Sequence, residues 1–122
     1  MRFLLDTHTF LWWDAGTLPA KVARRIRAAA EVRVSAASAW EVAIKAALGK
    51  IVVKGSFTEA GGDYGFDELP VCFAHAEMVR TLPPLHRDPF DRILVAQAIV
   101  EGLTIVTCDP LVAAYAVPNV WG

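Results

Sequence analysis

Four acidic residues lie in apolar stretches of the chain, and they are the first candidates for chemistry. Asp6 and Asp109 each follow a short strand-like run, whereas Glu41 and Asp91 lie inside apolar helical stretches. Most acids of a globular domain occupy exposed helix faces, so acids in apolar surroundings are the informative ones. Asp88 lies one helical turn before Asp91, and both lie at the positive end of that helix. We therefore expect these carboxylates to converge on one site.

Crowded carboxylates have a definite chemical consequence. They repel one another, so the pKa of at least one is expected to rise unless a cation is bound. Oxygen ligands without thiolates or a histidine pair favour Mg²⁺ or Mn²⁺ over Zn²⁺. Such a site activates water and stabilises the charge that develops in phosphoryl transfer. The acids therefore predict chemistry on a phosphodiester.

Each acid also has a structural explanation. Asp6, Asp88 and Asp109 could cap the helix or turn that follows, and Glu41 could pair with Lys45 at i, i+4. For any one acid taken singly, the structural explanation is preferred. For the whole set, with two acids at strand ends, a shared site is the better interpretation.

The apolar pattern alternates short strands with helices, which predicts an α/β fold around a mostly parallel sheet. Strands are expected at residues 2–6, 32–35, 71–73, 104–107 and 120–121. Helices are expected over residues 7–13 with a cap at Thr7, 18–30, from Ser35 or Ser38 to 48, 75–81, 90–100 and 110–115. Residues 50–68 are the least regular and suggest a short helix within a loop. Ligands of parallel sheets bind beyond the carboxyl ends of the strands, where Asp6 and Asp109 both lie.

Composition limits the alternatives. The chain has 122 residues, 55% of them hydrophobic, which suits one domain over residues 1–122. No window approaches the roughly 18 apolar residues of a membrane span, and the N-terminus has no signal-peptide pattern, so we expect a cytoplasmic protein with no membrane partner. Cys72 and Cys108 are expected as two reduced core thiols rather than a disulfide or a zinc site.

The charge is unevenly distributed. The net charge is −1, but residues 21–54 carry +6 and residues 55–77 carry −5. On charge alone, solvated helix faces are the preferred explanation. If four of the 13 acids are committed to metal, however, 12 bases face nine acids, and the near-neutral total no longer excludes RNA.

Four segments occur in an informative order: LLDTH at 4–8, SAWEVAIK at 38–45 followed by Gly49 and Lys50, LPPLHRDPFDRILVAQA at 82–98, and TIVTCD at 104–109. Together they resemble the PIN-domain ribonucleases and, among these, the VapC-type toxins of bacterial toxin–antitoxin modules. The resemblance spans nearly the whole chain. It implies a PIN-like three-layer fold, with a mostly parallel sheet of four or five strands flanked by helices.

The resemblance also implies roles for individual residues. The acidic quartet around Mg²⁺, or Mn²⁺, would be Asp6, Glu41, Asp91 and Asp109, with Asp6, Asp91 and Asp109 as metal ligands. Possible outer-shell residues are Asp88, Thr7 and Thr107, and possible phosphate contacts are Lys45 and Arg92. His8 stands where the family often has Asn, and we expect it to cap a helix or to lie at the core edge.

The function implied by the resemblance is a Mg²⁺-dependent endoribonuclease that is inhibited by a cognate antitoxin and forms a homodimer. Trp12, Trp13 and residues 55–77 are the contact surfaces that the resemblance suggests. Two alternatives stay open at this point. One is a PIN scaffold that has lost catalysis and binds RNA or protein, and the other is a metal-dependent phosphomonoesterase.

Overall fold

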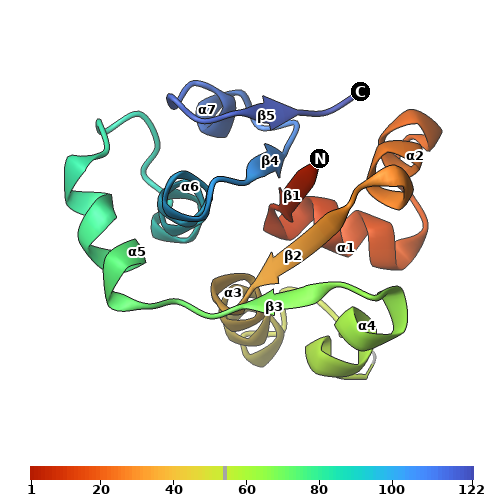
Figure 1. Ribbon diagram of the computed structural model, residues 1–122. Helices are drawn as coiled ribbons and strands as arrows, with labels where there is room; N and C mark the ends of the chain where they lie inside the picture. The colour runs from red at the N-terminus through yellow and green to blue at the C-terminus, as the bar shows by residue number, and fades with distance from the viewer. Residues whose placement is uncertain (54) are drawn as a thin grey trace.

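A single parallel sheet forms the centre of the molecule (Figure 1). The computed structural model describes residues 1–53 and 55–122. Within them the strand order is β3-β2-β1-β4-β5, and every neighbouring pair is parallel. The strands are β1 Arg2–Leu5, β2 Glu31–Ser35, β3 Asp67–Leu69, β4 Thr104–Val106 and β5 Asn119–Val120. The predicted α/β fold with a sheet of four or five strands is confirmed.

Helices connect the strands and cover the sheet. They are α1 Thr7–Ala15, α2 Ala20–Ala28, α3 Ala36–Ala47, α4 Phe57–Tyr64, α5 Phe73–Met78, α6 Pro89–Glu101 and α7 Pro110–Ala113. A 3-10 turn, Val79–Thr81, extends α5. The predicted amphipathic character of α2 is confirmed, because Val22 and Ile26 are buried while its bases face solvent.

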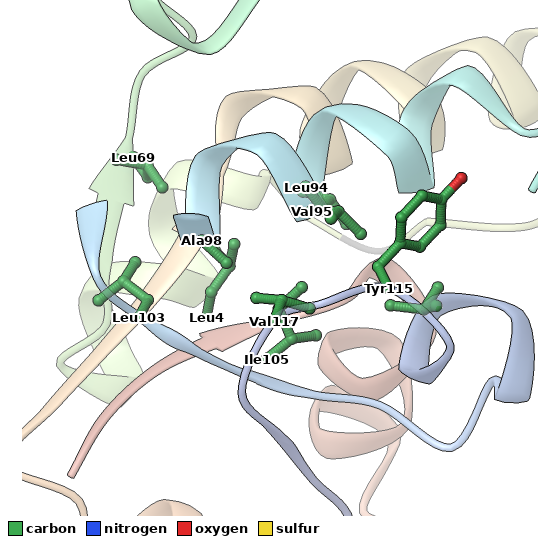
Figure 2. Packing of buried hydrophobic residues seen from close by; sticks show 10 residues of the cluster. Leu4, Leu69, Leu94, Val95, Ala98, Leu103, Ile105, Tyr115 and Val117 are labelled. Atoms are coloured by element: carbon green, nitrogen blue, oxygen red, sulfur yellow. The ribbon is translucent and has the colours of Figure 1, made fainter. Parts of the chain in front are cut away.

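Alternation along β1 divides the core into two layers. Leu4 packs on one face of the sheet with residues of α6 and β4, as Figure 2 shows. Phe3 and Leu5 pack on the other face, against residues of α1 and α2. Successive side chains of a strand point to opposite faces, so the three buried residues of β1 contribute to both layers. Helices therefore lie on both sides of the sheet, which is the predicted three-layer arrangement.

The third strand differs from the prediction. It lies at Asp67–Leu69, whereas residues 71–73 form no strand, and Phe73, which begins α5, is 87% exposed. β3 is an edge strand in which only Leu69 is buried. The two acids before Leu69 face solvent, so this strand lacks the apolar run on which the prediction depended.

The helix starts resolve the capping alternatives. Asp6, not Thr7, caps α1, and Ser35, not Ser38, caps α3. Gly16 takes the left-handed conformation after α1, with a φ of 72°, as expected for the residue that ends a helix. The caps matter for function because they fix the directions of the side chains that follow β1 and β2.

The two cysteines are free thiols, as predicted, but neither lies in the core. Cys72 precedes α5 and Cys108 follows β4, and both residues are exposed. The apolar neighbours in sequence were misleading because both cysteines lie in connections at the ends of elements, where chain direction and burial change within a few residues.

The bases between residues 21 and 54 do not form one free surface. Lys21, Arg24 and Arg25 are exposed on α2, whereas Arg33 is paired with Glu31. Lys54, the last base of the stretch, lies outside the described residues. No helix in the described ranges is long and apolar enough to cross a membrane.

Candidate active site

The sheet topology has a switch point between β1 and β4. The chain leaves β1 toward β2 and β3 on one side, and β4 and β5 lie on the other. Such a switch point is where open α/β sheets bind ligands. Asp6 directly follows β1, and its backbone N–H donates to the Val106 carbonyl of β4 at 3.2 Å. Asp109 follows β4, so two acids lie at the carboxyl ends of adjacent strands, as predicted.

Helix caps fix three of the acids, each through one oxygen. Asp6 Oδ1 accepts the Thr9 N–H at 2.9 Å, Asp88 Oδ1 accepts the Phe90 N–H at 2.8 Å, and Asp109 Oδ1 accepts the Leu111 N–H at 2.9 Å. The structural explanation of these acids is therefore correct. It does not compete with a shared site, because a cap occupies one carboxylate oxygen and the second oxygen is not part of the cap.

Asp91 lies at the electrostatic centre of the group. Its side chain is only 13% exposed in the first turn of α6. The pKa of Asp91 is raised from 3.8 to about 7, first by burial and then by the negative charges of Asp88, Asp6 and Glu41, against a lowering by His86. Three acids, from the end of β1, from α3 and from the cap of α6, thus act on one carboxyl group. The charges of Asp6, Glu41 and Asp88 therefore lie close enough to Asp91 to affect its ionisation.

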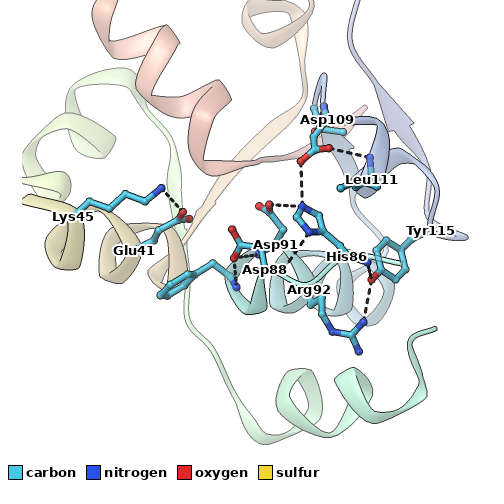
Figure 3. Close-up of polar contacts among 11 residues, drawn as sticks. Glu41, Lys45, His86, Asp88, Asp91, Arg92, Asp109, Leu111 and Tyr115 are labelled. Atoms are coloured by element: carbon cyan, nitrogen blue, oxygen red, sulfur yellow. Dashed lines mark hydrogen bonds and ion pairs between the residues drawn. The ribbon is translucent and has the colours of Figure 1, made fainter. Parts of the chain in front are cut away.

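Glu41 contributes the most deeply buried carboxylate. The residue is 3% exposed on α3, and its Oε2 accepts from Lys45 Nζ at 2.9 Å (Figure 3). This hydrogen bond, with the charges of Asp88 and Asp91 behind it, raises the pKa of Lys45. Glu41 Oε1 has no hydrogen-bond partner among the described residues. A buried, unpaired carboxylate oxygen is costly, so its position beside other acids calls for a cation or a water molecule.

The site also contains a residue outside the predicted set. His86 Nε2 lies 3.0 Å from Asp91 Oδ2 and 3.2 Å from Asp109 Oδ2, so the imidazole lies between the two carboxylates (Figure 3). His86, Asp91 and Asp109 form a group of three donors whose atoms lie within 4.8 Å of one another. The sequence offers no signal for this contact beyond the proximity of His86 to the α6 cap, because Asp109 is 23 residues away.

The PIN domain family matches residues 3–117 of the sequence. The chain belongs to the PIN domain family. A comparison with curated protein sequences yields no match. The matched range includes all the acids described above, and their role as the family's acidic cluster stays a prediction.

Solved structures share the fold of this PIN domain at low sequence identity. VapBC2 from Rickettsia felis, bound to a DNA fragment from its promoter, has a TM-score of 0.71 and 11% identity, and covers 100% of this chain and 99% of that chain. FitAcB from Neisseria gonorrhoeae has a TM-score of 0.66 and 18% identity, and the match covers 98% of this chain and 96% of that chain. VapBC-1 from nontypeable Haemophilus influenzae has a TM-score of 0.65 and 13% identity, covering 99% and 98%.

Two threonines of the PIN domain form hydrogen bonds in the segments that carry the acids. Thr7 Oγ1 donates to Ser38 Oγ at 2.9 Å, which ties the start of α1 to α3, and Thr107 Oγ1 accepts the Asp109 N–H at 3.0 Å. The outer-shell role of both threonines stays a prediction. His8, in contrast, is exposed, and its ring packs against that of Trp12 with centroids 5.8 Å apart. It caps no helix, because Asp6 makes that cap.

Arg92 holds the chain rather than facing the carboxylates. Its guanidinium donates to the carbonyls of Val79, Leu82 and Pro83, and to the Tyr115 hydroxyl at 3.0 Å. The Tyr115 hydroxyl in turn accepts the backbone N–H of His86 at 3.0 Å. Because these contacts engage the guanidinium, we retain Lys45 and not Arg92 as the candidate phosphate contact.

This arrangement predicts a stability effect. Arg92→Ala is expected to lower the free energy of unfolding by about 2 kcal/mol, since hydrogen bonds from a charged donor are lost together. Arg87→Ala is the matched control, because Arg87 is the exposed arginine of the same segment and should change stability by less than about 0.5 kcal/mol. Urea denaturation measures both. Equal effects in the two variants would show that Arg92 does not clamp this segment.

Proposed function

We propose that this PIN domain is a Mg²⁺-dependent endoribonuclease of the VapC toxin type, acting in the cytoplasm and opposed by a cognate antitoxin. One observation carries the proposal: buried Asp91 on α6 lies among acids from α3 and the end of β1, so burial and their charges raise its pKa to about 7, and His86 joins it to Asp109 after β4. An uncompensated acid cluster of this kind costs stability in a metal-free protein. Recruitment of a divalent cation for phosphodiester chemistry explains why it is present.

The donors fit a hard cation. Asp6, Asp91 and Asp109 would hold it, and the unpaired Oε1 of Glu41 is the buried oxygen that a cation or its hydration shell would satisfy. Oxygen donors of this number favour Mg²⁺ or Mn²⁺. The ion would supply Lewis acidity to the phosphodiester and offset the negative charge of the substrate.

The chain's own groups divide the remaining work. The caps of Asp6 and Asp109 hold their carboxylates in fixed directions without rearrangement during the reaction. Glu41 accepts from Lys45 with one oxygen, which leaves the other to orient a water molecule. Lys45 is 38% exposed, so its ammonium group can contact a phosphate at the edge of the site while still paired with Glu41.

The antitoxin part of the proposal draws on the structural neighbours, which are VapBC and FitAB complexes. The suggested contact residue Trp13 already packs against Tyr64 and Phe66, and Trp12 packs against Trp121. The large apolar residues that remain exposed on α3 and at its C-cap are Trp40, Ile44 and Leu48. They lie on the helix that carries Glu41, so we assign them to the antitoxin surface, from which a basic side chain would reach the carboxylates. The homodimer likewise remains part of the proposal.

Metal removal tests the proposed activity. The purified chain is expected to cleave single-stranded RNA in Mg²⁺, to lose all cleavage in excess chelator, and to regain it when Mg²⁺ is restored. The same chelator, saturated with Mg²⁺ before it is added, serves as the control. Turnover of small phosphate esters without RNA cleavage would instead indicate a phosphomonoesterase. RNA binding with no metal-dependent cleavage would indicate an inactive scaffold.

A further inference from the structure

His86 lies between two carboxylates of the acid cluster. Its Nε2 contacts one oxygen each of Asp91 and Asp109, and the side chain is 13% exposed. The contacts come from two different elements, the start of α6 and the end of β4, which the imidazole joins. No comparable donor approaches these two oxygens among the described contacts.

The other ring nitrogen determines which proton the imidazole carries. His86 Nδ1 lies 3.2 Å from the backbone N of Asp88, which is a donor. Nδ1 must therefore present its lone pair, and the ring proton lies on Nε2. A histidine that coordinates a metal through Nε2 needs the opposite tautomer. The contacts thus make His86 a hydrogen-bond donor to the carboxylates, not a ligand.

We propose that the His86 Nε2–H is a built-in competitor of the divalent cation, occupying the place between Asp91 and Asp109 until the ion displaces it. This inference rests on the proposed metal-dependent function. Magnesium–oxygen distances are about 2.0 to 2.1 Å, so an ion bound by both carboxylates requires the lone pairs and the space that the N–H now uses. The imidazole and the ion are therefore alternatives at these two oxygens.

The surrounding chain lets the ring leave without disturbing the core. His86 lies in the segment between the 3-10 turn and α6, where Leu85 and Arg87 are exposed. Its backbone is held separately, by the hydrogen bond from the His86 N–H to Tyr115. Rotation of the side chain thus breaks the Nε2 and Nδ1 contacts alone. The function of this arrangement is to hold the two acids together in the metal-free protein and to raise the metal concentration needed to load the site.

The test is calorimetric titration of Mg²⁺ into the full chain. His86→Ala is expected to bind Mg²⁺ on the order of tenfold more tightly than the wild type, because the ion no longer displaces a hydrogen bond to charged groups. His8→Ala is the matched control, since His8 is exposed near Asp6 but contacts Trp12, and it should leave the affinity unchanged. General damage to the site lowers affinity, so the direction of the change separates competition from a structural role.

Weaker or unchanged Mg²⁺ binding by His86→Ala would overturn the proposal. Weaker binding would mean that His86 is a metal ligand or supports the ligands. A second measurement uses the wild type with ¹⁵N-labelled histidine. Nuclear magnetic resonance is expected to show Nε2 protonated both without metal and at Mg²⁺ saturation, with the Nε2–H signal shifted by the loss of its carboxylate partners. Loss of that proton on Mg²⁺ binding would contradict competition. If the wild type binds no Mg²⁺ at all, the proposed function itself fails, which is a separate result.

Discussion

Replacing Asp91 with asparagine is expected to lower metal-dependent RNA cleavage by on the order of a thousandfold or more, as when a group acting directly on the reacting charge is removed. Asp91 is the acid on which burial and the charges of Asp6, Asp88 and Glu41 converge. Asparagine has nearly the same shape but carries no charge. The α6 N-terminus should be unaffected, because Asp88 and not Asp91 makes the cap. Single-turnover cleavage of a labelled RNA, with circular dichroism to verify the fold, measures the effect.

Asp88→Asn is the matched control for charge. It removes one negative charge three residues away, and asparagine caps a helix about as well as aspartate. We expect a loss of cleavage between about tenfold and a hundredfold, the range typical of outer-shell groups. If the cleavage rate falls by the same factor in both variants, Asp91 has no role beyond that of Asp88. Wild-type cleavage by Asp91→Asn would rule out the proposed metal site.

The predictable part of this protein consists of features with short-range causes. Asp6 and Asp109 could be placed together because each ends a strand-like run and parallel strands end at one edge. Asp88 and Asp91 could be placed on one helix face from their spacing. It was less evident from the sequence that one acid can both cap a helix and lie in a shared site. Capping and convergence looked like competing explanations, yet one oxygen of Asp6 caps α1 while the acid lies in the shared site.

The parts that escaped prediction depend on contacts between distant segments. His86 reaches Asp109 across 23 residues, and Arg92 donates to backbone carbonyls, which carry no sequence signature. β3 was missed for a different reason. It is an edge strand, so Asp67 and Glu68 remain in solvent and the buried pattern reduces to Leu69 alone. In each case tertiary position, not local propensity, decides the outcome.

The caps link stability to function at this site. A carboxylate that accepts a backbone N–H with one oxygen is held in one direction, and the same bond stabilises the helix by about 1 kcal/mol. Alanine at Asp6 or Asp109 would therefore remove a cap and a candidate ligand together. Asparagine removes the charge and keeps the cap. Asparagine variants are for this reason the ones that report on the chemistry.

The metal-free protein is expected to lose stability as the pH rises from 5 to 8. An unfolded aspartate has a pKa near 3.8, whereas burial and neighbouring acids raise the pKa of folded Asp91 to about 7. Between these values the folded protein holds a proton that the unfolded chain has released, so stability falls with pH in that window. The change across pH 5 to 8 is up to about 2 to 3 kcal/mol. Urea denaturation in chelator measures it.

Two substitutions locate the proton responsible. Asp91→Asn is expected to remove most of this slope and to be the more stable protein at pH 8, whereas Asp63→Asn, the same change at an exposed acid, should keep it. All three proteins contain the same histidines. If the pH dependence of stability survives in Asp91→Asn, the histidines and not Asp91 are its cause. Mg²⁺ at pH 8 should restore stability to the wild type and much less to Asp91→Asn, because the ion offsets the same carboxylate repulsion. Asp91→Asn would then lose activity and gain stability in the metal-free state. This behaviour is expected when acids are clustered to bind a cation and not to stabilise the fold.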